Sequence, residues 1–289
     1  MYMYLMSTTS LILFGQFFSL TTSSWVMSWL GMEMSLLGLL PLMLEKFKVK
    51  LLASEVTMKY FIIQSLSSMW LMLGGFFLWE MNNYEDLFFW LFIGGVVLKL
   101  GLFPGHFWVV QVINGLKIIP LFYVLTLVKV APLFLISNIL SNMSGYSSNL
   151  MYMLGTSSIM VGSLIGFIQS TLRGVIGGSS IAHNGWMIIS MQFSVLTLYY
   201  VAYLLSFLVF VWSFMSSEKM SVVLPILSFS GLPPFLLFAP KMLIFYGMMI
   251  SNMYIMLMTI IFFSVVSLFI YLKISFSYYL VKQIHIPNI

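Results

Sequence analysis

Four ionisable residues interrupt stretches of this sequence that are otherwise apolar enough to lie in lipid. Glu33 lies in "WLGMEMSLLGLLPLM", and Lys99, Lys129 and Lys241 lie in three other such stretches. A lysine near the centre of a membrane helix costs about 2.5–3.5 kcal/mol on insertion scales, and such residues commonly mark ion pathways or proton relays. Burial favours the neutral amine and a nearby carboxylate favours the ammonium, so a lysine that alternates between them takes up and releases a proton. The four residues therefore predict a proton relay.

Prolines accompany the three lysines. Pro104, Pro132 and Pro240 each lie within five residues of one of them. Proline removes a backbone donor and frees a carbonyl, and inside a membrane such groups need protein or water around them. The segments "GLFPGHF" and "GLPPFLLF" also resemble each other. We expect non-helical backbone around Leu102–Gly105 and around Leu232–Phe235, enclosed by protein or water.

Glu33 is the expected partner of Lys99, because an unpaired buried charge is expensive and an opposite charge compensates it. No carboxylate lies near Lys129 or Lys241 in the sequence. Two lysines in one apolar bundle repel each other, so we expect at least one to be neutral at rest, with polar side chains and waters between them. Structural ion pairing and snorkelling of the side chains to the membrane surface are the alternatives to a relay.

The segment "GGSSIAHNGW" holds the remaining candidate, His183, one helical turn from Ser179 and on the same face. Histidine titrates near physiological pH and can join a relay. A membrane histidine is equally often only hydrogen-bonded to a neighbouring helix, and both interpretations stay open. In the relay interpretation, His183 bridges the last two lysines. Gly177 and Gly178 indicate close helix packing rather than a phosphate loop, because no Gly-Lys-Ser/Thr follows them.

The composition places these residues in a polytopic membrane protein. Of the 289 residues, 61% are hydrophobic and 7% are charged, with a mean hydropathy of +1.07, whereas soluble domains average about 25% charged residues. The net charge of +5 is scattered along the chain and does not indicate nucleic-acid binding. The absence of cysteine excludes disulfides, cysteine-ligated iron–sulfur clusters and thiol catalysis within the chain.

Ten apolar stretches reach the length of about 20 residues that a membrane span needs. We expect spans near 4–22, 24–44, 56–79, 87–110, 117–140, 149–168, 175–195, 196–216, 221–247 and 252–280. They form one integral all-α domain over residues 1–289. Basic residues collect in alternate loops, which predicts that both termini lie on the inner side of the membrane. These residues are Lys46, Lys48, Lys50, Lys117, Arg173, Lys219 and Lys282, and the opposite loops hold Glu80, Glu85 and Asp86.

Six segments, in this order, resemble one protein family. They are "WLGMEMSLLGLLPLM", "ASEVTMKYFIIQSLSS", "LKLGLFPGHFWVVQVINGL", "LTLVKVAPLF", "STLRGVIGGSSIAHNGWM" and "SGLPPFLLFAPKM". Together they are similar to the NADH:ubiquinone oxidoreductase chain 2 family, the antiporter-like membrane subunits of mitochondrial complex I. The combination is specific, and it covers the chain between residues 25 and 245.

The resemblance implies a fold of paired inverted repeats of five helices, with broken helices at the two lysine–proline segments. It implies that Glu33, Lys99, Lys129 and Lys241 form the axis of a proton relay, to which we add His183. No cofactor is expected in this chain, whereas NADH, FMN, iron–sulfur clusters and ubiquinone are expected on partner subunits. The expected partners are other membrane subunits of complex I, including neighbouring antiporter-like chains, together with lipids. The expected location is the mitochondrial inner membrane, with both termini in the matrix.

The chain departs from the family pattern at Gly174 and Gly178, where relatives usually carry a lysine and a tyrosine. The chain ends 48 residues after Lys241, and we expect it to lack a further span that many animal relatives have. Its 25 methionines are ordinary for animal mitochondrially encoded chains. Two other functions stay open. One is a cation/proton antiporter of the same ancestry, and the other is a structural membrane subunit whose charges only pair with one another.

Overall fold

The computed structural model describes residues 2–44, 50–80, 86–142, 146–216, 219–233 and 235–284, and all regular structure in these ranges is helical. Two compact halves follow each other along the chain, Met1–Met143 and Ser144–Ile289. The predicted all-α class is confirmed for the described ranges. The single domain over residues 1–289 stays a prediction.

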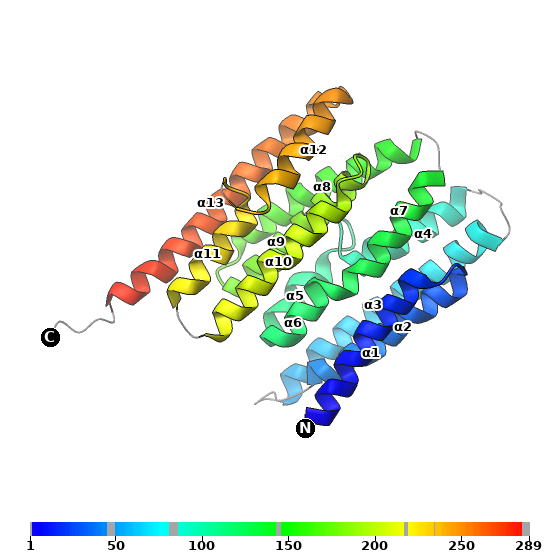
Figure 1. Cartoon of the computed structure of the whole chain (residues 1–289), viewed down its shortest axis with the longest axis horizontal. Coiled ribbons are helices and arrows are strands. Elements are labelled where there is room, and N and C mark those ends of the chain that lie inside the picture. Colours follow the sequence, from blue (N-terminus) through cyan, green and yellow to red (C-terminus); the bar gives the residue numbers. More distant parts are fainter. Residues whose placement is uncertain are drawn as a thin grey trace. The chain divides into compact units, whose positions relative to one another are not determined.

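The first half contains seven α-helices and one 3₁₀ turn within the residues that the structure describes (Figure 1). The elements are α1 (Tyr2–Thr21), α2 (Trp25–Leu44), α3 (Lys50–Glu80), α4 (Asp86–Leu100), α5 (Phe107–Gly115), α6 (Ile118–Leu125), η1 (Leu127–Lys129) and α7 (Val130–Asn142). Helix α1 packs along α2, and α3 packs along α4.

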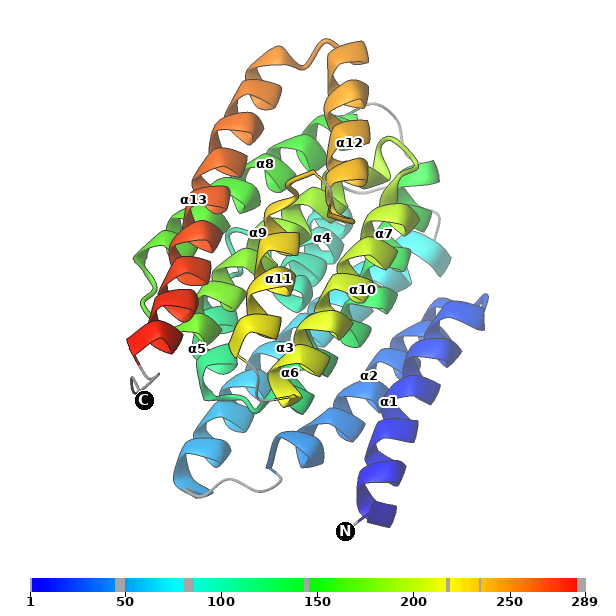
Figure 2. The same cartoon turned by 60° about the vertical axis from the view of Figure 1, so that its left-hand side comes forward.

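The second half is built from α8 to α13 (Figure 2). Their bounds are α8 (Tyr146–Ile168), α9 (Leu172–Met191), α10 (Leu196–Met215), α11 (Lys219–Ser230), α12 (Phe238–Ile250) and α13 (Tyr254–Ile284). Helix α8 packs along α9, while α13 packs against α8 and α11. Figure 2 shows α12 and α13 joined by a short connection at one end of this half.

Gly178 lies where α9 crosses α8 at close range. A Cβ at Gly178 would lie 2.6 Å from the backbone nitrogen of Gly166 and 3.0 Å from the carbonyl oxygen of Gly162. The crossing therefore has no room for a side chain, which confirms that Gly178 serves close packing. It also explains why the tyrosine expected from the family pattern is absent here.

Six helical stretches in the described residues are long and apolar enough to cross a membrane. They are Trp25–Leu44, Ala53–Leu78, Ile118–Ile139, Ser148–Ile168, Leu196–Met215 and Tyr254–Tyr278, and shorter apolar helices cover Leu87–Leu100 and Phe238–Ile250. These helices confirm a polytopic membrane fold. The count of ten spans and the inverted repeat stay predictions.

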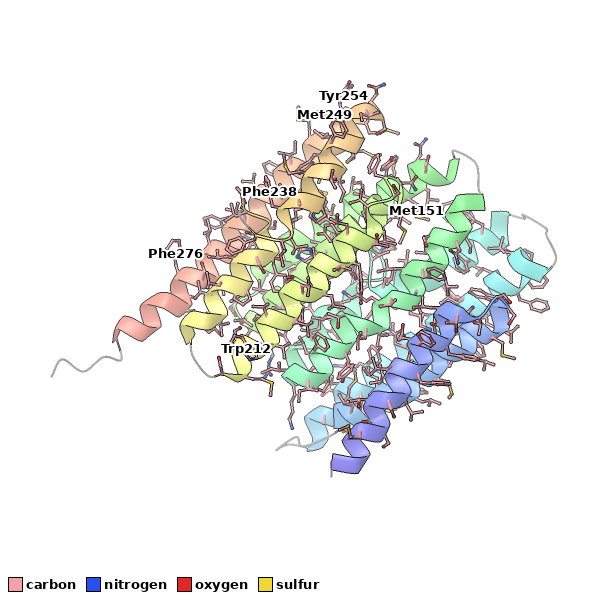
Figure 3. The ribbon with its side chains drawn as sticks, in the orientation of Figure 1. Met151, Trp212, Phe238, Met249, Tyr254 and Phe276 are labelled. Carbon is pink, nitrogen blue, oxygen red and sulfur yellow. The ribbon has the colours of Figure 1, made fainter. Side chains whose placement is uncertain are left out.

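The outer surface of the second half carries large apolar side chains. Trp212 is 73% exposed, and Met249, Tyr254 and Phe276 are each more than half exposed. Figure 3 shows these four side chains on the outer sides of α10, α12 and α13. The surface is suited to lipid or to the apolar helices of other membrane subunits.

Two helices are broken where the sequence predicts it. Helix α4 ends at Leu100 and α5 begins at Phe107, while α11 ends at Ser230 and α12 begins at Phe238. Residues 101–106, 231–233 and 235–237 are non-helical, which confirms both expected breaks within the described residues. Only one side of each break is enclosed, since Leu102 and Leu237 are buried whereas Phe103 and Leu236 are exposed.

A left-handed glycine starts each of these two breaks. Gly101 has a φ of 70° and Gly231 has a φ of 74°. Glycine tolerates this region because it has no Cβ, whereas other L-residues lose about 1–2 kcal/mol there. The Gly101 turn is closed by a hydrogen bond of 2.9 Å from the Leu102 amide to the Val97 carbonyl. The positive φ of Gly101 therefore ends α4, and the amides of Gly101 and Leu102 still bond to carbonyls in its last turns.

A third irregularity falls inside the predicted span 117–140, near Lys129 and Pro132. Helix α6 stops at Thr126, whose φ and ψ of −116° and −81° are non-helical, and a 3₁₀ turn leads to Lys129. Pro132 explains the position, because its ring clashes with the carbonyl four residues earlier and it offers no amide hydrogen. The Thr126 hydroxyl donates a hydrogen bond of 2.6 Å to the Phe122 carbonyl and so holds the end of α6.

Gly101→Ala should destabilise the assembled protein by about 2 kcal/mol, because alanine is strained at this φ and its Cβ would also collide with Val109. The midpoint of thermal inactivation measures the effect. Gly166→Ala is the matched control, since its new Cβ would meet only Ile270, at an ordinary 3.6 Å. Equal midpoints for the two variants would show that Gly101 is not required at the break.

Candidate proton-relay site

Glu33 and Lys99 form a buried ion pair in the first half. Glu33 comes from the middle of α2 and Lys99 from the last turn of α4. Lys99 Nζ lies 3.4 Å from Glu33 Oε1, with the lysine side chain 3% exposed and the glutamate side chain 24% exposed. The predicted pairing is confirmed. The carboxylate compensates a cation that burial would otherwise make expensive.

Two neutral side chains hold the end of α4, which carries Lys99. Trp108 on α5 donates its indole N–H to the Leu98 carbonyl at 3.0 Å. Gln64 on α3 donates its amide N–H to the Lys99 carbonyl at 3.4 Å. Carbonyls at a helix end lack intrahelical partners, so these bonds fix the end of α4 and with it the direction of Lys99. Gln64 and Trp108 are uncharged, and no sequence pattern predicted these roles for them.

Lys129 is buried at the irregularity between α6 and α7. It is the last residue of η1, and its amide donates to the Thr126 carbonyl at 3.1 Å. Two residues later the Ala131 amide donates to the Gln16 side-chain oxygen of α1 at 3.1 Å. An amide freed near the break is thus satisfied by protein, as the membrane environment requires.

Lys241 bridges the second break. Its ammonium donates to the Ser230 carbonyl at 2.8 Å and to the Phe229 carbonyl at 3.4 Å, both in the last turn of α11. It also lies 5.5 Å from the centre of the Trp186 ring. Free carbonyls at the C-terminus of a helix form the negative end of its dipole, and an aromatic face attracts a cation. The compensation of Lys241 therefore comes from backbone carbonyls and an aromatic ring. The expected polar side chains and waters between Lys129 and Lys241 stay a prediction.

Gly231 leaves the space that the Lys241 side chain occupies. A Cβ at this position would lie 2.8 Å from Lys241 Cδ and 2.9 Å from its Nζ. The glycine thus has two roles at the break, since it adopts a positive φ and also admits the lysine to the carbonyls of α11.

His183 lies in a buried aromatic cluster in the second half. Its Nδ1 is 2.8 Å from the Tyr199 hydroxyl, and its ring also contacts Tyr203 and Phe229. The Phe229 carbonyl accepts a hydrogen bond from Lys241. His183 and Lys241 thus share Phe229 as a neighbour. A bridge from His183 to Lys129 would join the two halves of the chain and stays a prediction.

The geometry creates two centres that can hold a proton on a buried side chain. The first contains the Glu33–Lys99 pair, and the break at Lys129 lies in the same half. The second contains Lys241 and His183. Each lysine adjoins non-helical backbone, where the chain can change its local conformation without unfolding a whole helix. Buried ionisable groups beside helix breaks are also the arrangement found in membrane transporters.

The sequence profile of the family described as "NADH:quinone oxidoreductase/Mrp antiporter, TM" matches residues 22–223. A land-snail protein, NADH-ubiquinone oxidoreductase chain 2 of Albinaria caerulea, is 35% identical over 273 residues, covering 94% of this chain and 88% of that protein. The chain belongs to the NADH-ubiquinone oxidoreductase chain 2 family. Chain 2 of Anopheles gambiae is 32% identical over 94% of this chain and 85% of its own length. The resemblance predicted from the sequence is confirmed.

Solved structures share the fold of this chain 2 family member. A chain of respiratory complex I from Thermus thermophilus aligns with a TM-score of 0.79 at 20% identity, over 94% of this chain and 70% of that one. A chain of the Mrp complex from Dietzia sp. aligns with a TM-score of 0.82 at 13% identity, over 91% and 58%. At these identities the likeness shows the fold alone.

Glu33→Gln should destabilise the assembled protein by about 1–3 kcal/mol, because it removes the carboxylate from a buried lysine at nearly constant volume. The shift of the thermal inactivation midpoint measures this. Glu55→Gln is the matched control, because it breaks the exposed Lys59–Glu55 pair, whose side chains are 46% and 57% exposed, and solvent screens such pairs so that they contribute little to stability. Equal shifts would contradict a special role for the Glu33–Lys99 pair.

Gly231→Ala should displace the Lys241 ammonium from the Ser230 carbonyl, because the new methyl group would occupy the space of the lysine stem. Gly101→Ala is its control for backbone strain, since the two φ values are within a few degrees and no lysine lies against Gly101. A structure of each variant in its complex would give the Lys241 Nζ to Ser230 oxygen distance. The same 2.8 Å distance in the Gly231 variant would disprove the displacement.

Proposed function

We propose that the chain is a proton-translocating membrane subunit of a respiratory NADH:ubiquinone oxidoreductase. The observation that carries the proposal is the Glu33–Lys99 ion pair, which is buried next to a helix break in a chain of this family. A structural pair needs no break beside it. A relay does, because the two charges must separate and rejoin as a proton moves.

The relay that we propose runs through Glu33, Lys99, Lys129, His183 and Lys241. When Glu33 moves away from Lys99, the ammonium loses the carboxylate that compensates its burial. Releasing the proton relieves that penalty, and a neighbouring buried amine can accept it. Lys129 belongs to the same half and is the proposed acceptor. His183 and Lys241 then continue the path in the second half.

The chain's own residues do no redox chemistry in this proposal. NADH oxidation and ubiquinone reduction take place on partner subunits, which carry FMN and iron–sulfur clusters. The proposed partners are the other membrane subunits, including neighbouring antiporter-like chains, which cover part of the exposed apolar surface. The proposed location is the mitochondrial inner membrane, with ten spans, an inverted five-helix repeat and both termini in the matrix.

Lys99→Met tests the relay, because methionine keeps much of the stem volume and cannot carry a proton. The variant complex is reconstituted into liposomes, and proton uptake is measured per NADH oxidised. We expect the rate of proton transfer along this path to fall by about 10²-fold or more, which is the scale for losing a proton-transfer group, and the proton uptake per NADH to fall with it. Lys129→Met should have the same effect.

Lys59→Met is the matched control, because Lys59 lies exposed on α3 and pairs with Glu55 at the surface. It should leave the proton yield unchanged. If the Lys99 variant assembles fully and pumps as well as the Lys59 variant, the charges are structural and the proposal fails. Exchange of Na⁺ or K⁺ for protons by the complex without NADH would instead favour the antiporter alternative.

A further inference from the structure

Gln16 occupies a buried position where α1 meets both α2 and the first turn of α7. Its side-chain oxygen accepts a hydrogen bond of 3.1 Å from the Ala131 amide. Its side-chain nitrogen donates a hydrogen bond of 2.8 Å to the Ser35 hydroxyl of α2. A carboxamide is one of few side chains that can accept and donate at the same time. Both ends of this one are used, and each end reaches a different helix.

The hydrogen bonds continue beyond Ser35 toward Glu33. The Ser35 hydroxyl donates to the Met32 carbonyl at 2.7 Å, and that carbonyl belongs to the peptide unit shared with Glu33. At the other end, Ala131 lies two residues after Lys129. Three hydrogen bonds therefore connect the backbone at Glu33 with the backbone just after Lys129. Such connected bonds polarise one another in a low-dielectric interior.

Close packing fixes the helix that carries Gln16. A Cβ on Gly31 of α2 would lie 2.7 Å from the Gly15 carbonyl oxygen and 2.8 Å from the Ser19 amide nitrogen of α1. The two backbones are therefore in direct contact on either side of Gln16. Small residues at such crossings let membrane helices approach closely. A shift of α1 would therefore also move α2, and the side-chain amide of Gln16 would move with both helices.

The simplest role for Gln16 would be to accept a hydrogen bond from the Ala131 amide, which lies next to the break. A single acceptor on α1 would be enough for that role, and the donor to Ser35 would be unnecessary. The second bond is what ties the helix carrying Glu33 to the break carrying Lys129. Local energetic links of this kind arise when two sites bias the same hydrogen-bonded element.

We propose that Gln16 is a positioning residue of the relay, which couples α2 at Glu33 to the backbone of the break at Lys129. The inference rests on the proposed function, because it assigns a role in proton transfer between those two residues. In this proposal Gln16 carries no proton itself. It acts by holding the backbone at the Lys129 break in a fixed position relative to α2, which carries Glu33.

Gln16→Met in the assembled complex tests the coupling, because methionine is similar in size and lacks both hydrogen-bonding groups. NADH oxidation, the amount of assembled complex and protons taken up per NADH are measured in liposomes. We expect the proton yield to fall roughly twofold or more, with NADH oxidation and assembly retained. Gln111→Met is the matched control, because Gln111 is exposed on α5, and it should leave all three quantities unchanged.

A double variant separates positioning from simple loss of packing. If Gln16 acts through Lys129, adding Gln16→Met to Lys129→Met should lower the proton yield no further. The inference would be overturned if Gln16→Met lowered the proton yield of the Lys129→Met variant by the same factor as it lowers that of the unmodified complex. An unchanged yield in Gln16→Met alone would also overturn it. Normal pumping by Lys129→Met would instead refute the proposed function, so the two failures are distinguishable.

Ser35→Ala covers the case in which Gln16→Met does not assemble. It removes one hydroxyl from the chain of hydrogen bonds and adds no bulk to the crossing of α1 and α2. We expect a smaller fall in proton yield than for Gln16→Met. In a protein that already carries Lys129→Met, Ser35→Ala should cause no further fall. A yield equal to that of the unmodified complex would overturn the inference.

Discussion

Backbone groups that lose their helical partners inside a membrane need another hydrogen-bond partner, because lipid tails supply none. This constraint acts three times in the described residues, once near each buried lysine. At the first break Trp108 and Gln64 donate to the carbonyls at the end of α4. After Lys129 the amide of Ala131 is satisfied by Gln16 from α1. At the second break the donor is Lys241 itself. The breaks are tolerated because specific side chains supply the hydrogen bonds that the backbone groups there would otherwise lack.

The same requirement explains why the helices around the breaks pack as they do. A side chain that must reach a carbonyl or an amide in a neighbouring element needs that element at a fixed distance. Small residues provide it, as at Gly31, where the backbones of α1 and α2 touch. The position of each buried charge is thus determined by its own helix and also by the neighbouring helix that completes the break. The residues that pack the helices of the first half and the residues that complete its breaks therefore lie in the same places.

The sequence predicted the features that follow from strong local signals. Intramembrane charges identified Glu33 and Lys99, and their pairing followed from the cost of a lone buried charge. Glycine with proline located the breaks at 101–106 and near 231–237. The uncharged partners were missed, since Gln16 and Gln64 look like isolated polar residues until the helices are assembled. A survey of amides within the spans would have flagged both. The compensation of Lys241 by Ser230 was also unpredictable, because it depends on how the chain turns at Gly231.

The two breaks differ in one respect that bears on mechanics. The carbonyls at the end of α4 are held by an indole and an amide, whose charge does not change. Those at the end of α11 are held by an ammonium. Hydrogen bonds from a charged donor are roughly twice as strong as those from a neutral one. Loss of the charge on Lys241 would therefore weaken the bonds that join α12 to the end of α11. The bonds from Trp108 and Gln64 to the end of α4 come from groups that do not titrate, so their strength would not depend on a proton.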